Sequence, residues 1–375
     1  MDKKPSILAL VSYRVFPALM GGQKCVAAFY EELQTLSNLK LVVSSDNDLA
    51  FAKQLDADNY LYNHWKGFYN LGYFWRLKKT IQTHQIEYLI IEHSYFGWLG
   101  WLLRLFCKVE LILRVHNIEA YRFRDMHRKW WRIYYFYEHW ICKSANQIWF
   151  TSPNDAAWMQ ATWNIPSHCC TVLNYGVDVL TAPSLIEKKQ QRQILLDQFQ
   201  LHPQTRLFLF NGTLDYIPNT DALRIIVSEL LPRLDKLQKG YRIFICGNRI
   251  TEQWKKELER NPQIILAGFV PDISVFYKGT DCFINPVTLG SGVKTKLVEA
   301  LAYNQDIISV VSGAKGIEAS YCGEKLQLVS DYDWDAFTIA MMQLELPSRN
   351  QTPQAFYQDF NWKHIVDKAI LSLQS

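Results

Sequence analysis

Residues 285–302 read Asn-Pro-Val-Thr-Leu-Gly-Ser-Gly-Val-Lys-Thr-Lys-Leu-Val-Glu-Ala-Leu-Ala, and the rest of the chain is organised around them. They follow the apolar run Cys-Phe-Ile at 282–284, which is typical of a buried strand. Two glycines then lead into a segment whose apolar residues recur at helical spacing. The stretch therefore predicts a strand, a glycine-rich loop and the N-terminus of a helix.

Such a junction favours an anion, because the first helical turn presents unpaired N–H groups and the positive end of the helix dipole. Lys294 and Lys296 place cations where they are ordinarily unfavourable, which makes sense if a phosphate binds there. Glu299 lies about a turn and a half further in, so its carboxylate can reach back toward ribose hydroxyls. The alternative is an ordinary turn with solvated lysines. A P-loop is excluded, because Val293 separates Gly292 from Lys294.

Residues 286–302 resemble the nucleotide-sugar signature of the retaining GT-B glycosyltransferases of the family 4 group, especially the branch with a Gly-Ser-Gly-x-Lys-x-Lys-x-x-Glu-Ala pattern. Residues 17–22, 174–178, 211–219 and 268–272 also resemble segments of this family, in the same order. The resemblance covers nearly the whole chain. It implies an α/β fold of the GT-B type, in which two doubly wound parallel-sheet domains face each other across a cleft.

The length and the strand pattern predict two domains. A chain of 375 residues is long enough for two hydrophobic cores. Apolar runs at 7–11, 39–44, 88–91, 111–115 and 147–151, and again at 207–210, 242–246, 264–266, 282–284 and 307–311, alternate with helical patterns. This alternation indicates parallel, doubly wound sheets. We expect an acceptor-side domain over 1–178, a nucleotide-sugar-binding domain over 179–355, and a final helix within 356–375 that, as the resemblance implies, crosses back to the first domain.

The cysteines and the apolar runs predict a cytoplasmic location. Eight cysteines show no Cys-x-x-Cys pair, and several lie in strand-like runs, which is typical of reduced, buried thiols. The apolar run at 7–11 is too short for a signal peptide. No window of 18 uncharged apolar residues is present, so residues 95–107 are expected to form a buried or membrane-facing helix.

Ligands of parallel sheets gather at the carboxyl ends of the strands, so polar residues just past the expected strands are candidate site residues. Gly21 and Gly22 precede an amphipathic segment and form a second anion-compatible loop. His116 follows the run 111–115; a solitary histidine in such a place is more often a structural residue. The resemblance instead implies that His116 contacts the transferred sugar or the acceptor. His93, Asn117 and Glu119 are the candidates for the acceptor side.

The resemblance assigns further roles. His116 and Lys294 are the expected catalytic residues. The expected donor-binding residues are Gly21, Gly22, Gly212, Thr213, Ser291, Gly292, Val293, Lys294, Thr295, Lys296 and Glu299. Two features depart from many relatives: Ser291 occupies the place of the first glutamate of a Glu-x7-Glu pair, and an Arg and a Lys are missing after the strand at 207–210. The positive charge for the phosphates must therefore come mainly from Lys294 and Lys296.

No cofactor is expected beside the nucleotide-diphosphate sugar, which is a substrate, and no metal is expected. Asp56-Ala57-Asp58 spells Asp-x-Asp but is interpreted as part of a polar connection in the first domain. No His or Cys cluster has the spacing of zinc ligands. Lysines, glycine amides and a helix dipole can stabilise a departing diphosphate without an ion.

Residues 114–140 combine cations with aromatic rings. The cations are Arg114, Arg122, Arg124, Arg128, Lys129 and Arg132, and the rings are Trp130, Trp131, Tyr134, Tyr135, Phe136, Tyr137 and Trp140. Residues 114–132 carry an excess of four positive charges, equal to the formal net charge of +4 of the whole chain. Such a combination is typical of docking on an anionic membrane surface. The alternative is that the rings pack onto the sheet. Nucleic acid is not expected, because no recognition motif is present.

The sequence thus predicts a retaining glycosyltransferase that moves a sugar from a nucleotide-diphosphate sugar to a glycan or lipid-linked glycan acceptor. The setting would be cell-surface polysaccharide or lipopolysaccharide synthesis, at the inner face of the cytoplasmic membrane. The resemblance implies that the leaving phosphate receives the proton of the acceptor. Two alternatives stay open: a GT-B-like nucleotide-sugar epimerase, and a non-catalytic module that binds sugar nucleotides or docks on membranes.

Overall fold

The computed structural model describes residues 4–19, 21–62, 65–237, 240–290 and 294–374. The chain forms two compact units, one comprising Met1–Gly176 with Phe360–Ser375 and the other Val177–Asp359. The first unit is therefore built from both ends of the chain. The boundaries expected from the sequence were residues 178 and 356.

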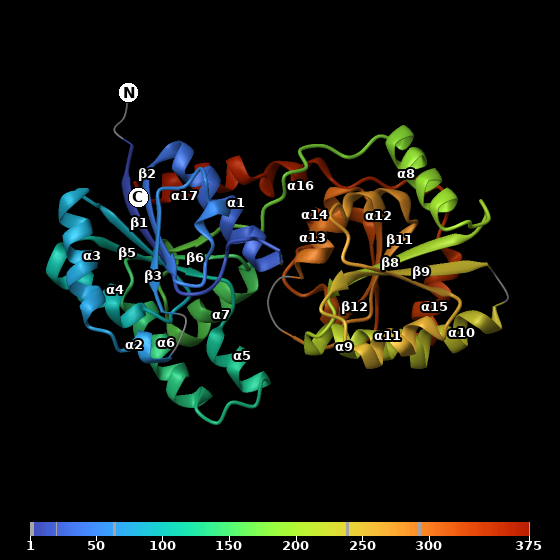
Figure 1. The fold of residues 1–375 in the computed structure, drawn as a ribbon, viewed down its shortest axis with the longest axis horizontal. Coiled ribbons are helices and arrows are strands. Elements are labelled where there is room, and N and C mark those ends of the chain that lie inside the picture. Colours follow the sequence, from blue (N-terminus) through green and yellow to red (C-terminus); the bar gives the residue numbers. More distant parts are fainter. Residues whose placement is uncertain (1–3, 20, 63–64, 238–239, 291–293, 375) are drawn as a thin grey trace. The chain divides into compact units, whose positions relative to one another are not determined.

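The first unit is built on a sheet of seven parallel strands in the order β3-β2-β1-β4-β5-β6-β7 (Figure 1). The strands are β1 (Ser6–Val11), β2 (Asn38–Ser44), β3 (Ala57–Leu61), β4 (Tyr88–Glu92), β5 (Glu110–Val115), β6 (Gln147–Phe150) and β7 (Cys170–Val172). The direction of winding reverses between β1 and β4, which are neighbours in the sheet. Ligands of doubly wound sheets bind at such a switch point, beyond the carboxyl ends of the strands.

Helices on both faces of this sheet bury its apolar strands. They are α1 (Gly21–Leu36), α2 (Trp65–Phe68), α3 (Gly72–Thr83), α4 (Gly97–Cys107), α5 (Glu119–Asp125), α6 (Trp131–Ser144), α7 (Pro153–Trp163) and α17 (Trp362–Ser372). The C-terminal helix α17 packs against α1. Tyr88 Oη donates a hydrogen bond to the Leu373 carbonyl at 3.0 Å, and Trp149 Nε1 donates to Ser372 Oγ at 3.0 Å. These bonds attach the end of the chain to the first sheet.

The second unit has six parallel strands in the order β10-β9-β8-β11-β12-β13. They are β8 (Arg206–Thr213), β9 (Tyr241–Asn248), β10 (Ile264–Gly268), β11 (Cys282–Asn285), β12 (Asp306–Val310) and β13 (Leu326–Val329). The winding reverses between β8 and β11, so this sheet has a switch point of its own. The two parallel sheets confirm the predicted α/β, doubly wound class.

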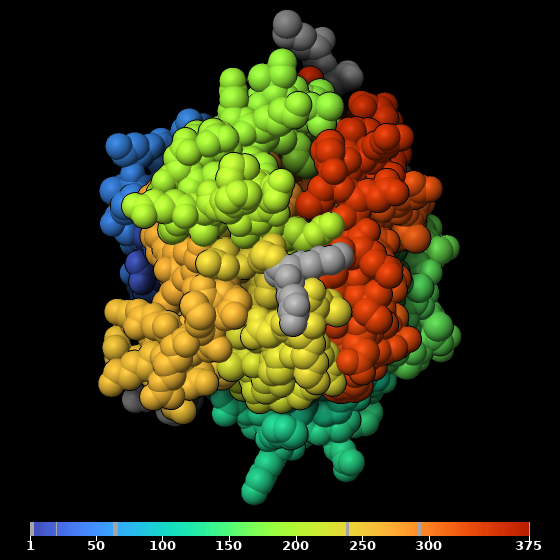
Figure 2. All heavy atoms as spheres, turned by 90° about the vertical axis from the view of Figure 1, so that its right-hand side faces the viewer, coloured from blue at the N-terminus to red at the C-terminus, as the bar shows by residue number. Residues whose placement is uncertain are grey.

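The helices of the second unit differ widely in polarity. They are α8 (Leu185–Gln198), α9 (Ile217–Ile225), the π-helix η3 (Ile226–Leu230), α10 (Leu231–Lys236), α11 (Glu252–Glu259), α12 (Ser274–Gly279), α13 (Thr295–Ala302), α14 (Ala319–Cys322), α15 (Trp334–Gln343) and α16 (Gln354–Asp359). Both α8 and α11 are strongly polar, and α8 starts with a capping box formed by Ser184 and Glu187. Figure 2 shows α8 in green on the surface of the unit, as its composition requires.

The edge strands β3, β7 and β13 escaped prediction, because they are only partly buried and lack an apolar run. One interpretation was wrong for the same reason. The Asp-x-Asp sequence does not lie in a connection, since Ala57 begins β3. Lys40 Nζ pairs with Asp56 Oδ1 at 2.6 Å and with Asp58 Oδ2 at 3.4 Å, so these carboxylates are used in a pairing between β2 and the edge of the sheet.

Candidate active site

The glycine-rich loop of the second unit connects β11 to α13, as the sequence predicted. The loop is anchored at its start by Asn285, which is fully buried and donates hydrogen bonds to Ser309 Oγ and the Gly313 carbonyl, both at 2.9 Å. Lys294 is the N-cap residue of α13, and Thr295 is its first residue. Of the predicted donor-binding residues, Ser291, Gly292 and Val293 lie outside the described part of the chain.

Lys296 lies at the switch point between β8 and β11. Its Nζ donates to Asn219 Oδ1 at 2.7 Å and lies 4.6 Å from the centre of the Phe210 ring. No carboxylate among the described residues lies within 4.0 Å of this ammonium. Desolvation, together with the charge of Lys294, lowers the pKa of Lys296 to about 7. The group therefore lacks an anionic partner that would hold it charged.

Lys294 adds a second desolvated cation. Its Nζ donates to the Gly290 carbonyl at 2.8 Å. Desolvation, and then the charge of Lys315, lowers the pKa of Lys294 to about 8. An anion bound between the two ammonium groups would raise both pKa values, so the loop is electrostatically suited to phosphate.

The end of β8 forms the wall beside Lys296. Gly212 has φ 155°, and a Cβ there would lie 2.6 Å from Asn219 Nδ2 and 3.1 Å from Lys296 Nζ. A side chain at this position would push the two groups apart. The carbonyl of Thr213, the next residue, accepts from Asn219 Nδ2 at 2.8 Å. The structure thus brings Gly212 and Thr213 together with Lys296, as the resemblance implies.

Glu299 is held on the same helix by a tyrosine. Tyr277 Oη donates to Glu299 Oε2 at 3.1 Å and accepts from Asn211 Nδ2 at 2.9 Å, while the Tyr277 ring stacks on that of Tyr303 at 5.4 Å. The Glu299 charge raises the pKa of Lys296, so the two groups are close enough to interact. The contacts of Asn211, Asn219 and Tyr277 were not found from the sequence, although Asn211 and Asn219 lie within a segment that resembles the family.

At the switch point of the first unit, His116 is bound to a buried carboxylate. Glu92 ends β4, and its Oε2 lies 2.5 Å from His116 Nε2. Its Oε1 accepts from Arg114 Nη1 at 2.8 Å and from Tyr30 Oη at 2.7 Å. Burial alone would raise the pKa of Glu92, but Arg114 and His116 outweigh burial and hold it well below its ordinary value. An ionised carboxylate only accepts, so His116 Nε2 carries a proton and Nδ1 is the nitrogen left for a ligand.

His93 and Glu119 lie next to this pair. The rings of His93 and His116 are 4.8 Å apart, and His93 Nδ1 is 3.4 Å from Glu119 Oε1. Burial lowers the pKa of His93 to about 4, so the ring is neutral at pH 7. The backbone of His93 has φ 59°, in the left-handed region that histidine adopts more often than most residues other than glycine. Glu119 accepts from Arg122 Nε at 2.8 Å and from Tyr95 Oη. Asn117 is half-buried beside them.

Gly21 and Gly22 begin α1, in agreement with the predicted loop and helix N-terminus. The Gly21 carbonyl accepts from Tyr175 Oη at 3.2 Å, which ties the start of α1 to the end of the first unit. A Cβ at Gly22 would meet no described atom within 4 Å, so the space over this residue is open. Their role in donor binding stays a prediction.

The interpretation of residues 114–140 as one docking surface needs correction. Arg114 is fully buried in its pair with Glu92 and presents no charge to the surface. Tyr137 Oη donates toward the carbonyls of Ser94 and Tyr95, at 3.0 and 3.1 Å, so this ring faces inward. The segment is therefore part core and part surface. Its exposed large apolar side chains are Met126, Trp130, Ile133, Phe136 and Trp140.

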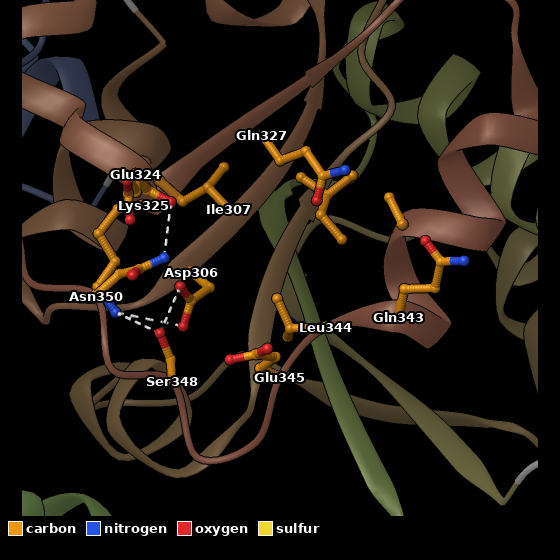
Figure 3. A pocket seen from close by; sticks show the side chains of 12 residues that line it. Asp306, Ile307, Glu324, Lys325, Gln327, Gln343, Leu344, Glu345, Ser348 and Asn350 are labelled. Carbon is orange, nitrogen blue, oxygen red and sulfur yellow. Dashed lines mark hydrogen bonds and ion pairs between the residues drawn. The ribbon is translucent and has the colours of Figure 1, made fainter.

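A pocket of about 310 Å³ lies at the opposite edge of the second sheet, where β12 and β13 begin (Figure 3). Lys325 Nζ lies 3.3 Å from Asp306 Oδ2 and 3.3 Å from Ser348 Oγ, and Ser348 Oγ donates to Asp306 Oδ1 at 2.9 Å. These groups satisfy one another. Within the described ranges, no group of three His, Cys, Asp or Glu side chains is arranged to hold a metal ion.

Comparison with known proteins assigns both units to glycosyltransferase families. Residues 205–345 match the family described as Glycosyl transferases group 1, and residues 21–179 match Glycosyltransferase Family 4. A glycosyltransferase from Rickettsia africae has the same fold, with a TM-score of 0.73 at 13% identity over 99% of this chain and 98% of that one. Anabaena Alr3699/HepE in complex with UDP and glucose gives 0.72 at 14% identity, over 99% of this chain and all of that one.

One curated relative is an uncharacterized 44.6 kDa protein in the cps region of Klebsiella pneumoniae. It is 26% identical over 275 residues, which cover 68% of this chain. The matched part spans 65% of the length of that relative.

Proposed function

Because the chain belongs to the group 1 glycosyltransferases of the GT-B fold, we propose that it is a retaining enzyme that transfers a sugar from a nucleotide-diphosphate sugar to a glycan or lipid-linked glycan. The observation that carries this proposal is the pair of desolvated lysines, Lys294 and Lys296, beside Glu299 at the switch point of the second sheet. UDP and glucose in the Anabaena structure agree with a nucleotide-sugar donor.

The setting we propose is cell-surface polysaccharide or lipopolysaccharide synthesis. The Klebsiella relative lies in a cps region. The fold also matches WaaG, a glycosyltransferase involved in lipopolysaccharide biosynthesis, with a TM-score of 0.62 at 13% identity over 96% of this chain and 95% of that one. Both support an acceptor that is a growing surface glycan. We further propose membership of the Gly-Ser-Gly-x-Lys-x-Lys-x-x-Glu-Ala branch, on the motif at 290–300.

In the donor half of the proposed mechanism, Lys294 and Lys296 bind the diphosphate and stabilise the charge that grows on it as the sugar leaves. Glu299, held by Tyr277, accepts hydrogen bonds from the ribose. Two ammonium groups and the N-terminus of α13 supply positive charge to the leaving group without a metal ion.

In the acceptor half, His116 presents Nδ1 to the transferred sugar or the acceptor, with His93, Asn117 and Glu119 on the acceptor side. Glu92 is poorly suited to act as a nucleophile, because Arg114, His116 and Tyr30 already occupy its oxygens. A mechanism in which the leaving phosphate takes the acceptor proton needs no pair of carboxylates of the glycosidase kind.

A screen with labelled UDP- and GDP-sugars tests the proposal. Slow release of nucleotide together with free sugar supports transfer to water in place of the acceptor. An isomerised donor would support an epimerase, and binding without turnover would support a non-catalytic module. With an acceptor in hand, NMR of the product reports the anomeric configuration, and inversion would contradict the retaining mechanism.

We also propose that the enzyme docks on the inner face of the cytoplasmic membrane through a surface formed by α3, α4 and α6. These helices pack side by side. They expose Trp75, Leu105, Phe106, Ile133, Phe136 and Trp140, which we call the α3–α4–α6 surface. The sequences of the three helices contain Arg76, Lys78, Lys79, Arg104, Arg132 and Lys143 but a single acid, Glu138, which is buried. Aromatic rings and unopposed cations suit an anionic leaflet.

Liposome co-sedimentation tests this docking. Among the described helices none is long and apolar enough to span a bilayer. Replacing Lys78, Lys79 and Arg132 with Ser should release the protein from anionic liposomes, at about 1 kcal/mol per charge. The matched control replaces the exposed Lys236, Lys255 and Lys256 of the second unit. Equal loss in both variants, or no binding of the wild type at low salt, would contradict the surface.

A further inference from the structure

The side chain of Asn219 is fixed in one orientation between a strand and a helix. It is buried in the first turn of α9, where its backbone N–H donates to the Tyr216 carbonyl at 2.8 Å. Its Nδ2 donates to the Thr213 carbonyl and its Oδ1 accepts from Lys296 Nζ. A carbonyl can only accept and an ammonium can only donate, so the amide cannot be flipped. Asn219 thereby defines where the Lys296 ammonium lies.

The partner of this cation is a side-chain amide. The ion-paired cations of the chain meet a carboxylate instead: Arg114 meets Glu92 at 2.8 Å, Arg192 meets Asp281 at 2.6 Å, and Lys325 meets Asp306 at 3.3 Å. Half-buried cations such as Lys188 and Arg104 donate to backbone carbonyls, at 2.8 and 2.7 Å. Lys296 meets a neutral amide of the same shape as aspartate. An amide oxygen fixes the direction of the ammonium but leaves its net charge uncompensated.

We propose that Asn219 is a positioning residue that holds the Lys296 ammonium beside Gly212 through a neutral acceptor, so that the full charge of the lysine is available to the diphosphate of the donor. This inference rests on the proposed function of the site. It adds a residue that touches no substrate atom and acts through Lys296. It also accounts for Gly212, because any side chain there would displace both partners.

The groups around the ammonium decide how it responds to a ligand. Lys294 and Glu299, on its own helix, are the charges that act on it. From β8 it meets the Phe210 ring and Gly212, and from α9 it meets Asn219, all of them neutral. Since the pKa of Lys296 is about 7, part of the population is neutral at pH 7 before the donor binds. A bound diphosphate would raise this pKa, so the neutral part of the population would take up a proton from the buffer.

The test is calorimetry of UDP, GDP and the two free nucleosides in buffers of different ionisation enthalpy, which measures proton uptake. The wild type should take up about half a proton at pH 7 with the diphosphate that it binds. In Asn219→Asp the carboxylate holds Lys296 charged in advance. Proton uptake should therefore fall toward zero and diphosphate affinity should fall at least tenfold, while nucleoside affinity is unchanged. Asn261→Asp, two residues beyond the end of α11, is the matched control, because Asn261 Nδ2 also donates to a backbone carbonyl, and it should change neither quantity.

The aspartate places an oxygen against the Thr213 carbonyl, so a second variant guards against misfolding. In Asn219→Leu the new side chain has a similar size, but the Lys296 ammonium loses its hydrogen-bond acceptor. Its diphosphate affinity should also fall while nucleoside affinity holds. Diphosphate affinity and proton uptake equal to wild type in both variants would overturn the role of Asn219 and leave the proposed function standing. Failure of the wild type to bind UDP or GDP would instead overturn the proposed function.

Discussion

Two lysines of the second unit lie at opposite ends of the same sheet. Lys325, where β13 begins, is almost fully buried and shares Asp306 with Ser348 (Figure 3). Lys296, beyond the carboxyl ends of β8 and β11, has Asn219 as its hydrogen-bond partner. Burial lowers the pKa of both, but at Lys325 the charge of Asp306 opposes that effect at ion-pair distance. One cation is compensated by the fold, and the other is held ready for an anion from outside.

The partner of a buried lysine distinguishes a structural role from a ligand-binding role better than the extent of its burial does. Both lysines are desolvated, and a pocket of about 310 Å³ lies beside Lys325. What distinguishes Lys296 is its position at a switch point together with the missing carboxylate. A charged group whose partner is neutral costs stability, and a fold retains it where a ligand supplies the counter-charge.

The largest expected effect is on stability. Lys325→Met leaves Asp306 buried without its cation, which should lower the free energy of unfolding by about 3–5 kcal/mol. Urea denaturation followed by circular dichroism measures the change. Adding Asp306→Asn removes the stranded charge and should restore most of the loss. If Lys325→Met is as stable as the wild type, the ion pair of Lys325 with Asp306 does not contribute to stability. Lys325 and Lys296 would then not differ in the way proposed.

Lys296→Met should behave in the opposite way. No carboxylate of the described chain loses an ion pair, so the free energy of unfolding should stay the same or rise. Affinity for the nucleoside diphosphate should fall by about 2–3 kcal/mol, because a charge-assisted bond to phosphate is lost. Calorimetry with the diphosphate and the bare nucleoside checks this. An equal loss for both ligands would mean that the substitution disturbed the fold.

A smaller effect is expected at Glu299, which lies on the same helix as Lys296. Glu299→Gln keeps an acceptor for the ribose but removes the charge, so affinity should fall by about 1.5 kcal/mol. Here the nucleoside and the diphosphate should lose the same amount, which distinguishes a ribose contact from a phosphate contact. Unchanged affinity for both would remove Glu299 from the site.

The elements that carry Lys296 could be predicted from the sequence, but the partners of Lys296 and Arg114 could not. The strand, loop and helix around residues 285–302 follow from local periodicity and glycine placement. The isolation of Lys296 depends on Asn219, 77 residues earlier in the chain. Arg114 was misassigned to the surface because counting charges ignores pairing, and its partner Glu92 lies 22 residues away on the neighbouring strand.

The smallest expected effect is on the pH dependence of stability, and it isolates the Lys296 charge itself. The folded pKa of about 7 lies below the ordinary value of 10.5, so between these values the unfolded chain holds a proton that the folded chain has released. Stability contributed by this group therefore rises with pH in that window, by at most about 1.4 kcal/mol per pH unit. Between pH 7 and pH 8 the free energy of unfolding of the wild type should rise by about 1 kcal/mol relative to that of Lys296→Met. Saturating diphosphate should abolish this rise, because the bound anion keeps the lysine charged. Parallel stability curves for the two proteins without ligand would show that Lys296 is ordinarily protonated, and that solvent compensates it as Asp306 compensates Lys325.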